Sequence, residues 1–128
     1  MPKKDMVLDS SFLMVVSRTK LSETLPLKSL LGQYNVVVPR TIIRELEKIT
    51  KGKSIKAKNA RTALQFLGSY EVVGDETGGN VDDAILEVAR ERNAAVATLD
   101  AELIVNLKAL GISLITLRNN RLVGLNDT

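Results

Sequence analysis

The run Val36-Val37-Val38, which Pro39 terminates, constrains the fold more than any other part of the sequence. Consecutive β-branched residues without polar alternation predict a strand buried on both faces, as in parallel sheets covered by helices. Shorter strand-like runs on either side alternate with helical segments. We therefore expect an α/β fold, a three-layer α/β/α sandwich whose mostly parallel central sheet has about five strands. The 128 residues fit one domain, covering 1–128.

Turn residues and hydrophobic periodicity set the expected boundaries of the elements. Strands are expected at residues 6–8, 34–38, 70–73, 94–98 and 112–117, with a last short strand at 122–123 after a turn at 119–120. Helices are expected after Ser10 and at 21–33, 41–49, 54–67, 81–93 and 100–110, and residues 74–80 form a glycine-rich loop. In such folds the functional groups lie at the carboxyl ends of the strands, near the point where the strand order reverses.

The sequence contains neither histidine nor cysteine. This excludes disulfides, thiolate metal sites, and the Ser-His and Cys-His pairs of nucleophilic catalysis. An enzyme of this composition depends on carboxylates, Lys, Arg and hydroxyl groups. Carboxylates without histidine are best suited to hard, oxygen-preferring cations such as Mg²⁺ or Mn²⁺.

Hydropathy and charge indicate the compartment and the kind of partner expected for this chain. No apolar run approaches the ~18 residues needed to cross a bilayer, so no membrane association is expected. Asp9 interrupts the apolar run near the N-terminus and no small-residue cleavage site follows, which favours a cytoplasmic protein over a secreted one. A net charge of +3 is compatible with nucleic-acid binding without demonstrating it.

Five acidic residues are expected at the carboxyl edge of the sheet, either directly after a strand or on the helix that follows one: Asp9, Glu45, Asp82, Asp83 and Asp100. Asp9 and Asp100 each follow a predicted strand, and parallel strands project both carboxylates from the same edge. Helix capping could account for Asp9, Asp100 and one of the Asp82-Asp83 pair, because Asp favours N-caps and first turns.

Glu45 is not explained by capping. A capping box anchored at Thr41 needs its Glu or Gln at position 44, where the sequence has Arg44. Glu45 lies one step from the apolar stripe that includes Ile42 and Leu46, so it needs either a basic partner or a metal ion. Several carboxylates at one edge repel one another unless a cation neutralises them, and Mg²⁺ binds a few carboxylates while retaining waters.

Four segments in this order resemble the PIN-domain nucleases: VLDSSFL, VVVPRTIIRELEKI, NVDDAILEVARERNAAVATLDAEL and GISLITLR. The resemblance extends roughly from Met6 to Arg118, and the ordered set is far more specific than D-S-S-F-L alone. Within the family the sequence is most similar to the archaeal and eukaryotic branch associated with small-subunit ribosomal RNA processing. The toxin ribonucleases of toxin–antitoxin operons form the neighbouring branch and share the same acids.

The resemblance implies a Mg²⁺- or Mn²⁺-dependent endoribonuclease that cleaves RNA phosphodiesters in ribosomal RNA processing and leaves 5′-phosphate and 3′-hydroxyl ends. Two alternatives stay open: a toxin ribonuclease with an antitoxin partner, and a non-catalytic RNA-binding PIN module. PIN proteins often dimerise, so the resemblance also implies a homodimer.

Carried over residue by residue, the resemblance implies these catalytic and metal-binding acids: Asp9, Glu45, Asp83 and Asp100. The third acid of the family falls on the Asp82-Asp83 pair; counting back from Ala84 favours Asp83, while Asp82 as a ligand or a shared role stays open. Ser10 and Thr98 match hydroxyl positions that orient the carboxylates. Leu99 departs from relatives that often have a polar residue there, but this removes no ligand.

Residues around these acids are less specific. Glu102 is either an outer acid of the site or an exposed helix residue. Five cationic side chains form a basic run suited to RNA phosphates, with a solvated helix face as the alternative: Lys51, Lys53, Lys56, Lys58 and Arg61. With two Phe, two Tyr and no Trp, base stacking contributes little, so backbone charge and metal coordination are expected to dominate binding of single-stranded RNA.

Overall fold

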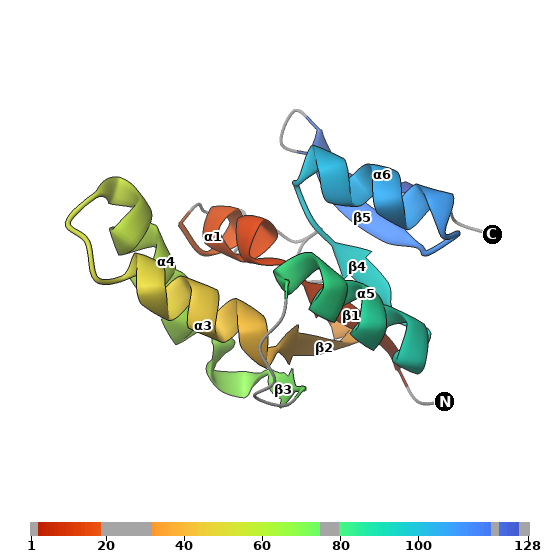
Figure 1. Cartoon of the computed structure of the whole chain (residues 1–128), viewed down its shortest axis with the longest axis horizontal. Helices are drawn as coiled ribbons and strands as arrows, with labels where there is room; N and C mark the ends of the chain where they lie inside the picture. Colours follow the sequence, from red (N-terminus) through yellow and green to blue (C-terminus); the bar gives the residue numbers. More distant parts are fainter. Residues whose placement is uncertain (1–2, 19–31, 75–79, 119–120, 126–128) are drawn as a thin grey trace.

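The fold is a six-stranded sheet flanked by helices, as a computed structural model of the chain describes for residues 3–18, 32–74, 80–118 and 121–125 (Figure 1). The strands are β1 Lys4–Leu8, β2 Tyr34–Pro39, β3 Glu71–Val73, β4 Ala95–Ala97, β5 Leu114–Arg118 and β6 Arg121–Leu125. The helices are α1 Ser10–Arg18, α3 Arg40–Ile49, α4 Ile55–Phe66, α5 Val81–Arg92 and α6 Ala101–Ala109, with a 3₁₀ turn at Leu67–Ser69. The elements predicted within 21–31, 75–79 and 119–120 lie outside the described residues.

The strand order is β3-β2-β1-β4-β5-β6, and all neighbours are parallel except β6, which runs antiparallel to β5. The expected mostly parallel sheet is therefore confirmed, with five parallel strands and one antiparallel addition. The chain moves outward in one direction from β1 to β3 and in the other direction from β4 to β5. Because crossovers between parallel strands are almost always right-handed, the helices of the two halves are expected on opposite faces of the sheet. The order reverses between β1 and β4, and the carboxyl ends of these two strands define the position expected for a site.

The core forms around the central strands. Val36, Val37 and Val38 are all buried, which confirms the expectation drawn from the valine run. On α3, Ile42 and Leu46 are fully buried against this core, whereas Glu45 beside them is half-buried at its margin. None of the helices in the described ranges is long and apolar enough to cross a membrane.

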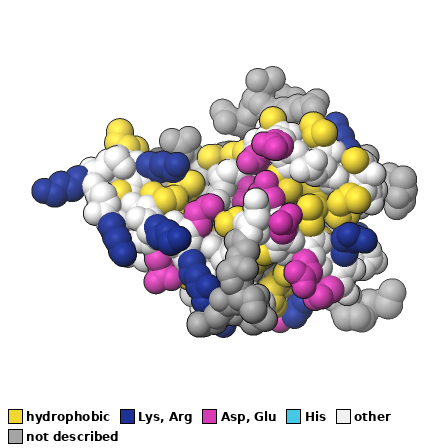
Figure 2. Space-filling view, viewed as in Figure 1, with side chains coloured by type: hydrophobic (Ala, Val, Ile, Leu, Met, Phe, Trp, Pro, Cys, Tyr) yellow, Lys and Arg dark blue, Asp and Glu magenta, His cyan; other side chains and the backbone are white. Residues whose placement is uncertain are grey.

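Charged side chains are unevenly distributed over the face seen in Figure 2. Asp and Glu side chains run down the middle of this face, whereas Lys and Arg gather over the end of the molecule formed by α3 and α4. The acidic column and the basic end are therefore accessible from the same side of the molecule.

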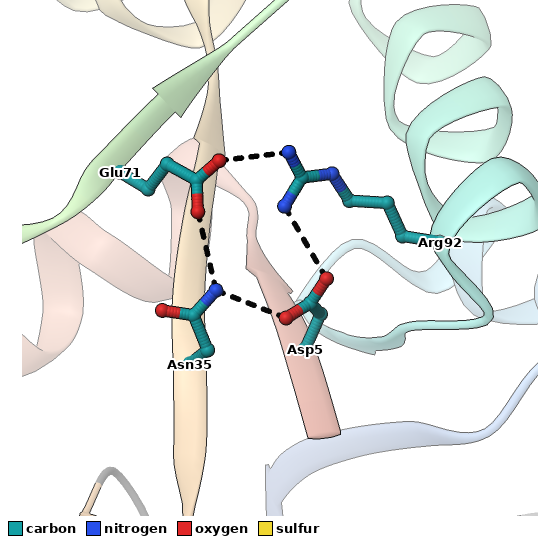
Figure 3. Close-up of polar contacts among 4 residues, drawn as sticks. All are labelled: Asp5, Asn35, Glu71 and Arg92. Atoms are coloured by element: carbon teal, nitrogen blue, oxygen red, sulfur yellow. Dashed lines mark hydrogen bonds and ion pairs between the residues drawn. The ribbon is translucent and has the colours of Figure 1, made fainter. Parts of the chain in front are cut away.

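A polar network closes the amino-terminal end of the sheet (Figure 3). Arg92, the last residue of α5, contacts Asp5 of β1 at 3.3 Å and Glu71 of β3 at 2.7 Å. Asn35 of β2 lies between them, and its side-chain amide donates to Asp5 at 2.9 Å and to Glu71 at 3.2 Å. The hydrogen bonds from Arg92 and then Asn35 lower the pKa of Glu71. One guanidinium thus ties α5 to two strands that are not adjacent in the sheet.

Replacing Arg92 tests this network. We expect Arg92→Ala to lower the free energy of unfolding by about 1 kcal/mol, because the network is partly exposed and surface ion pairs contribute little singly. A carboxylate with a lowered pKa stabilises the fold above its ordinary value of 4.5 and loses that contribution as the pH falls through its folded-state pKa. The difference between wild type and variant in urea titrations should therefore shrink on acidification. Arg90→Ala, on the same helix, is the matched control; an equal loss there would contradict the assignment.

Candidate active site at the carboxyl ends of β1 and β4

Asp9, immediately after β1, is a buried carboxylate held by three hydrogen-bond donors. It is 5% exposed. The backbone N–H of Ser10 donates to Oδ1 at 2.8 Å, while the hydroxyls of Ser11 and Thr98 donate to Oδ2 at 2.9 and 2.7 Å. No Lys or Arg within the described ranges pairs with it. A carboxylate has about four lone-pair positions, so these donors leave roughly one free on Oδ1.

Thr98 and Ser11 connect Asp9 to the loop after β4. β1 and β4 are in parallel register, with Leu8 opposite Ala97, so Asp9 and Thr98 lie side by side at the strand ends. The Thr98 hydroxyl also accepts from the N–H of Asp100 at 3.0 Å, and the Ser11 hydroxyl accepts from the N–H of Leu99 at 3.1 Å. Each hydroxyl thus donates to Asp9 and accepts from the loop that carries Asp100.

Ser10 and Thr98 were predicted from the sequence as positioning hydroxyls, whereas Ser11 was not. Ser10 contacts two carboxylates: its backbone N–H donates to Asp9, and its hydroxyl donates to Oε1 of Glu45 at 2.5 Å. The available signal for Ser11 was its position two residues after an Asp at a helix start, where a hydroxyl can fold back onto the carboxylate.

Glu45 enters the site from α3. Its Oε1 is fixed by Ser10, which lies at the start of α1, so one hydrogen bond joins the helices that follow β1 and β2. Within the part of the chain that the structure describes, Glu45 has no salt bridge, so the basic partner considered as an alternative is not found there. Its second oxygen remains available to a ligand.

Asp100 caps a helix with one carboxylate oxygen and leaves the other oxygen available to the site. Oδ1 accepts from the N–H groups of Glu102 at 2.9 Å and Leu103 at 3.2 Å, which makes Asp100 the N-cap of α6. No donor among the described residues reaches Oδ2. Asp100 is therefore an N-cap, as the alternative predicted, but capping occupies only one of its two carboxylate oxygens.

Neither Asp82 nor Asp83 is the N-cap of α5, although both lie in its first turn, where the helix dipole favours carboxylates. The N-cap of α5 is Asn80, whose side-chain oxygen accepts from the N–H of Asp82 at 2.8 Å. The pKa of Asp82 is raised, first by partial burial and then by the negative charges of the other acids of the site, which are Asp100, Asp9, Glu102 and Glu45. Asp83 is exposed. The structure therefore places Asp82 within the electrostatic field of the site, although the sequence favours Asp83.

These residues are chemically suited to a divalent cation. Like charges that have no basic partner among the described residues favour a neutralising ion, and here their repulsion adds to partial burial in raising the pKa of Asp82. No group of three or more carboxylates within the described ranges is close enough to hold one ion directly. Mg²⁺ is commonly held by one or two carboxylates together with waters and substrate phosphates, so a partly hydrated ion fits this donor set.

The predicted basic run lies on α4 and on the loop between α3 and α4. Lys51, Lys53, Lys56 and Lys58 are exposed. Arg61 is different, because its guanidinium donates to the carbonyl of Thr50 at 2.8 Å and to that of Gly52 at 3.4 Å. Arg61 therefore ties the loop to α4.

The sequence and the fold agree on a family. The model of the PIN-like domain family matches residues 6–120, and the chain belongs to this family. The structure is similar to that of the PIN domain endonuclease Utp24, with 21% identity, a TM-score of 0.76, and coverage of 100% of this chain and 96% of that one. It is also similar to a domain of a functionally unknown protein from Methanocaldococcus jannaschii DSM 2661, with 21% identity, a TM-score of 0.70, and coverage of 92% and 94%. No curated protein sequence matches the chain at a significant level.

Asp82 and Asp83 can be distinguished by the stability of the metal-free protein. A carboxyl with a raised pKa is penalised in its charged form, so the penalty exists above its folded-state pKa and disappears as the pH falls. Asp82→Asn should therefore stabilise the metal-free protein at pH 7, by about 1 kcal/mol or less, and the gain should vanish on acidification. Asp83→Asn is the matched control and should change little. A larger gain from Asp83→Asn would exclude Asp82 from the charge cluster.

The role of Thr98 can be tested by removing only its hydroxyl. Thr98→Val leaves a buried carboxylate without one of its donors and should lower the free energy of unfolding by about 1–3 kcal/mol in urea titrations. Thr98→Ser keeps the donor and should retain most of the stability. Equal losses in the two variants would show that packing of the methyl group, and not the hydrogen bond to Asp9, is what matters.

Proposed function

We propose that this protein is a divalent-metal-dependent endoribonuclease, with ribosomal RNA precursors as its candidate substrate. The observation that carries the proposal is the gathering of Asp9, Glu45, Asp82 and Asp100 where the strand order reverses, with no basic partner among the described residues. Membership in the PIN-like family and the similarity to a PIN domain endonuclease support it. The ribosomal substrate comes from the sequence resemblance to the rRNA-processing branch.

Four carboxylates are the proposed metal-binding and catalytic residues: Asp9, Glu45, Asp82 and Asp100. A bound Mg²⁺ or Mn²⁺ would activate a water molecule and stabilise the charge that develops on the phosphodiester oxygens. Directly or through waters of the ion, Asp100 would offer Oδ2 while Oδ1 caps α6, and Glu45 would offer Oε2 while Ser10 holds Oε1. Asp9 offers the remaining lone pair of Oδ1. Glu102, whose charge also raises the pKa of Asp82, is proposed as an outer acid that adds to the field.

The hydroxyl groups have a positioning role in this proposal. Thr98 and Ser11 fix the orientation of Asp9 and the course of the loop that carries Asp100. Ser10 fixes Glu45. Because these hydrogen bonds exist before substrate binds, the carboxylates need little rearrangement to receive an ion.

The proposal is tested by cleavage of a single-stranded oligoribonucleotide and a ribosomal RNA fragment with Mn²⁺, comparing wild type with Asp100→Asn. Asparagine is as good an N-cap as aspartate, so this change keeps α6 intact and removes only the charge. We expect cleavage to fall by more than about 100-fold, beyond the loss typical of a residue that only orients a ligand. Products from the wild type should carry 5′-phosphate ends.

Asp83→Asn is the control for this experiment and should keep most of the activity. Undiminished cleavage by Asp100→Asn would contradict the catalytic assignment. A wild type that binds RNA but cleaves neither substrate with Mg²⁺ or Mn²⁺ would favour the non-catalytic RNA-binding module.

A further inference from the structure

Charge is segregated along this chain to an unusual degree. Residues 48–70 contain six cations and no acid: Lys48, Lys51, Lys53, Lys56, Lys58 and Arg61. The whole chain has 18 basic and 15 acidic residues, so the remainder has 12 and 15 and is net negative by three. The positive charge of the protein therefore originates from the hairpin formed by α3 and α4. Protein surfaces usually mix positive and negative side chains, and a surface that carries only positive charge attracts a polyanion.

The helix dipoles account for the positions of only some of these lysines. Lys48 and Lys51 lie near the carboxyl end of α3, where the helix dipole favours cations. Lys53, Lys56 and Lys58 instead lie before or within the first turns of α4, where the dipole disfavours them, and that turn contains no acid. In the part of the chain that the structure describes, none of these lysines forms an ion pair.

The loop that carries Lys51 and Lys53 is held in place. Arg61 donates to the carbonyls of Thr50 and Gly52, and the hydroxyl of Ser54 caps α4 by accepting from the N–H of Ala57 at 3.1 Å. Beside the lysines, Ile55 is 78% exposed. The tip of the hairpin thus presents exposed lysines on a tethered backbone, together with an apolar side chain.

The tip is close to the acids. From Glu45 to Thr50 the axis of α3 advances by about 8 Å, and Lys48 lies one turn beyond Glu45 on the same side of the helix. Figure 2 shows the basic end and the acidic column on one face. A strand whose phosphodiester lies at the acids can therefore reach the tip within a few nucleotides.

We propose that the α3–α4 tip, defined as Lys48, Lys51, Lys53, Lys56 and Lys58 with Ile55, is a docking surface for the backbone of the RNA strand that flanks the cleavage site. This inference rests on the proposed function, and it assigns RNA affinity to a surface separate from the metal-binding acids. Recognition there is independent of base sequence, because lysines contact phosphates and the chain has few aromatic residues for stacking. Arg61 is a positioning residue for the loop.

The test measures binding of a fluorescent single-stranded oligoribonucleotide in metal-free buffer, so that the outcome does not depend on cleavage. The tip variant is Lys51→Gln, Lys53→Gln and Lys56→Gln together. Its control removes the same charge elsewhere, through Lys3→Gln, Arg90→Gln and Lys108→Gln, all exposed positions. We expect the Kd to rise about tenfold or more in the tip variant and much less in the control. The slope of log K against log salt should fall by about two, for three lost phosphate contacts on a single strand.

Two further measurements make the result decisive. Replacing the same three lysines by arginine keeps the charge and should restore most of the affinity. Equal Kd values for the tip variant and the control would overturn the proposal, whether or not the protein cleaves RNA. Vesicles containing phosphatidylserine test the other polyanion: vesicle binding that is lost in the tip variant while RNA binding is unchanged would also overturn it, in favour of a membrane surface.

Discussion

The hydrogen bonds to Asp9 are the interaction on which the rest of the site depends. Burial of a charged carboxylate is costly unless its oxygens are satisfied, and here a backbone N–H and two hydroxyls satisfy them. Both hydroxyls also accept from the backbone after β4, so the requirement of one buried charge fixes the loop that presents Asp100. Ser10, next in the chain, extends the arrangement to Glu45. The sheet contributes by bringing the ends of β1 and β4 into register.

The acids at this edge oppose the stability of the fold. The charged form of Asp82 is disfavoured and its pKa is raised, because its surroundings exclude part of the solvent and because the other carboxylates repel it. The opposite end of the sheet has the reverse arrangement, since Arg92 and Asn35 compensate Asp5 and Glu71. Helix α5 spans both ends, with Asp82 in its first turn and Arg92 as its last residue. Among the described acids, Asp82 at the carboxyl edge is thus repelled by neighbouring carboxylates, whereas Asp5 and Glu71 at the opposite end share a basic partner.

Much of the fold could be predicted because its signals are local. The buried valines of β2 indicated a parallel sheet, and α6 ends at Ala109, within one residue of the predicted boundary and just before Gly111, which adopts a φ of 69°. The candidate acids were also recognisable, since each lies shortly after the end of a strand or on the helix that follows one. The sequence could not decide between Asp82 and Asp83, because neighbouring helix positions differ by about 100° and the phase depends on the cap; Asp82 is our proposal. That cap is Asn80, whose role the sequence did not reveal.

Other features required the tertiary structure. Asp5, Asn35, Glu71 and Arg92 are far apart in the sequence, and only the register of β1, β2 and β3 brings them together. Arg61 belonged by composition to the basic run, yet its hydrogen bonds to backbone carbonyls give it a different role from the lysines. The partners of Arg92 and of Arg61 could therefore not be predicted from the spacing of residues in the sequence.

The central claim, that the acids at the ends of β1 and β4 bind a divalent cation, is tested most directly by NMR with trace Mn²⁺, which broadens backbone amide signals near the ion. We expect broadening at Asp9–Ser11, Glu45, Asp82 and Thr98–Glu102, with the amides near Arg92 unaffected. In Asp82→Asn this broadening should weaken, while Asp83→Asn should preserve it. Broadening that is absent from these positions, or that centres on Asp5 and Glu71 at the opposite end of the sheet, would contradict the account.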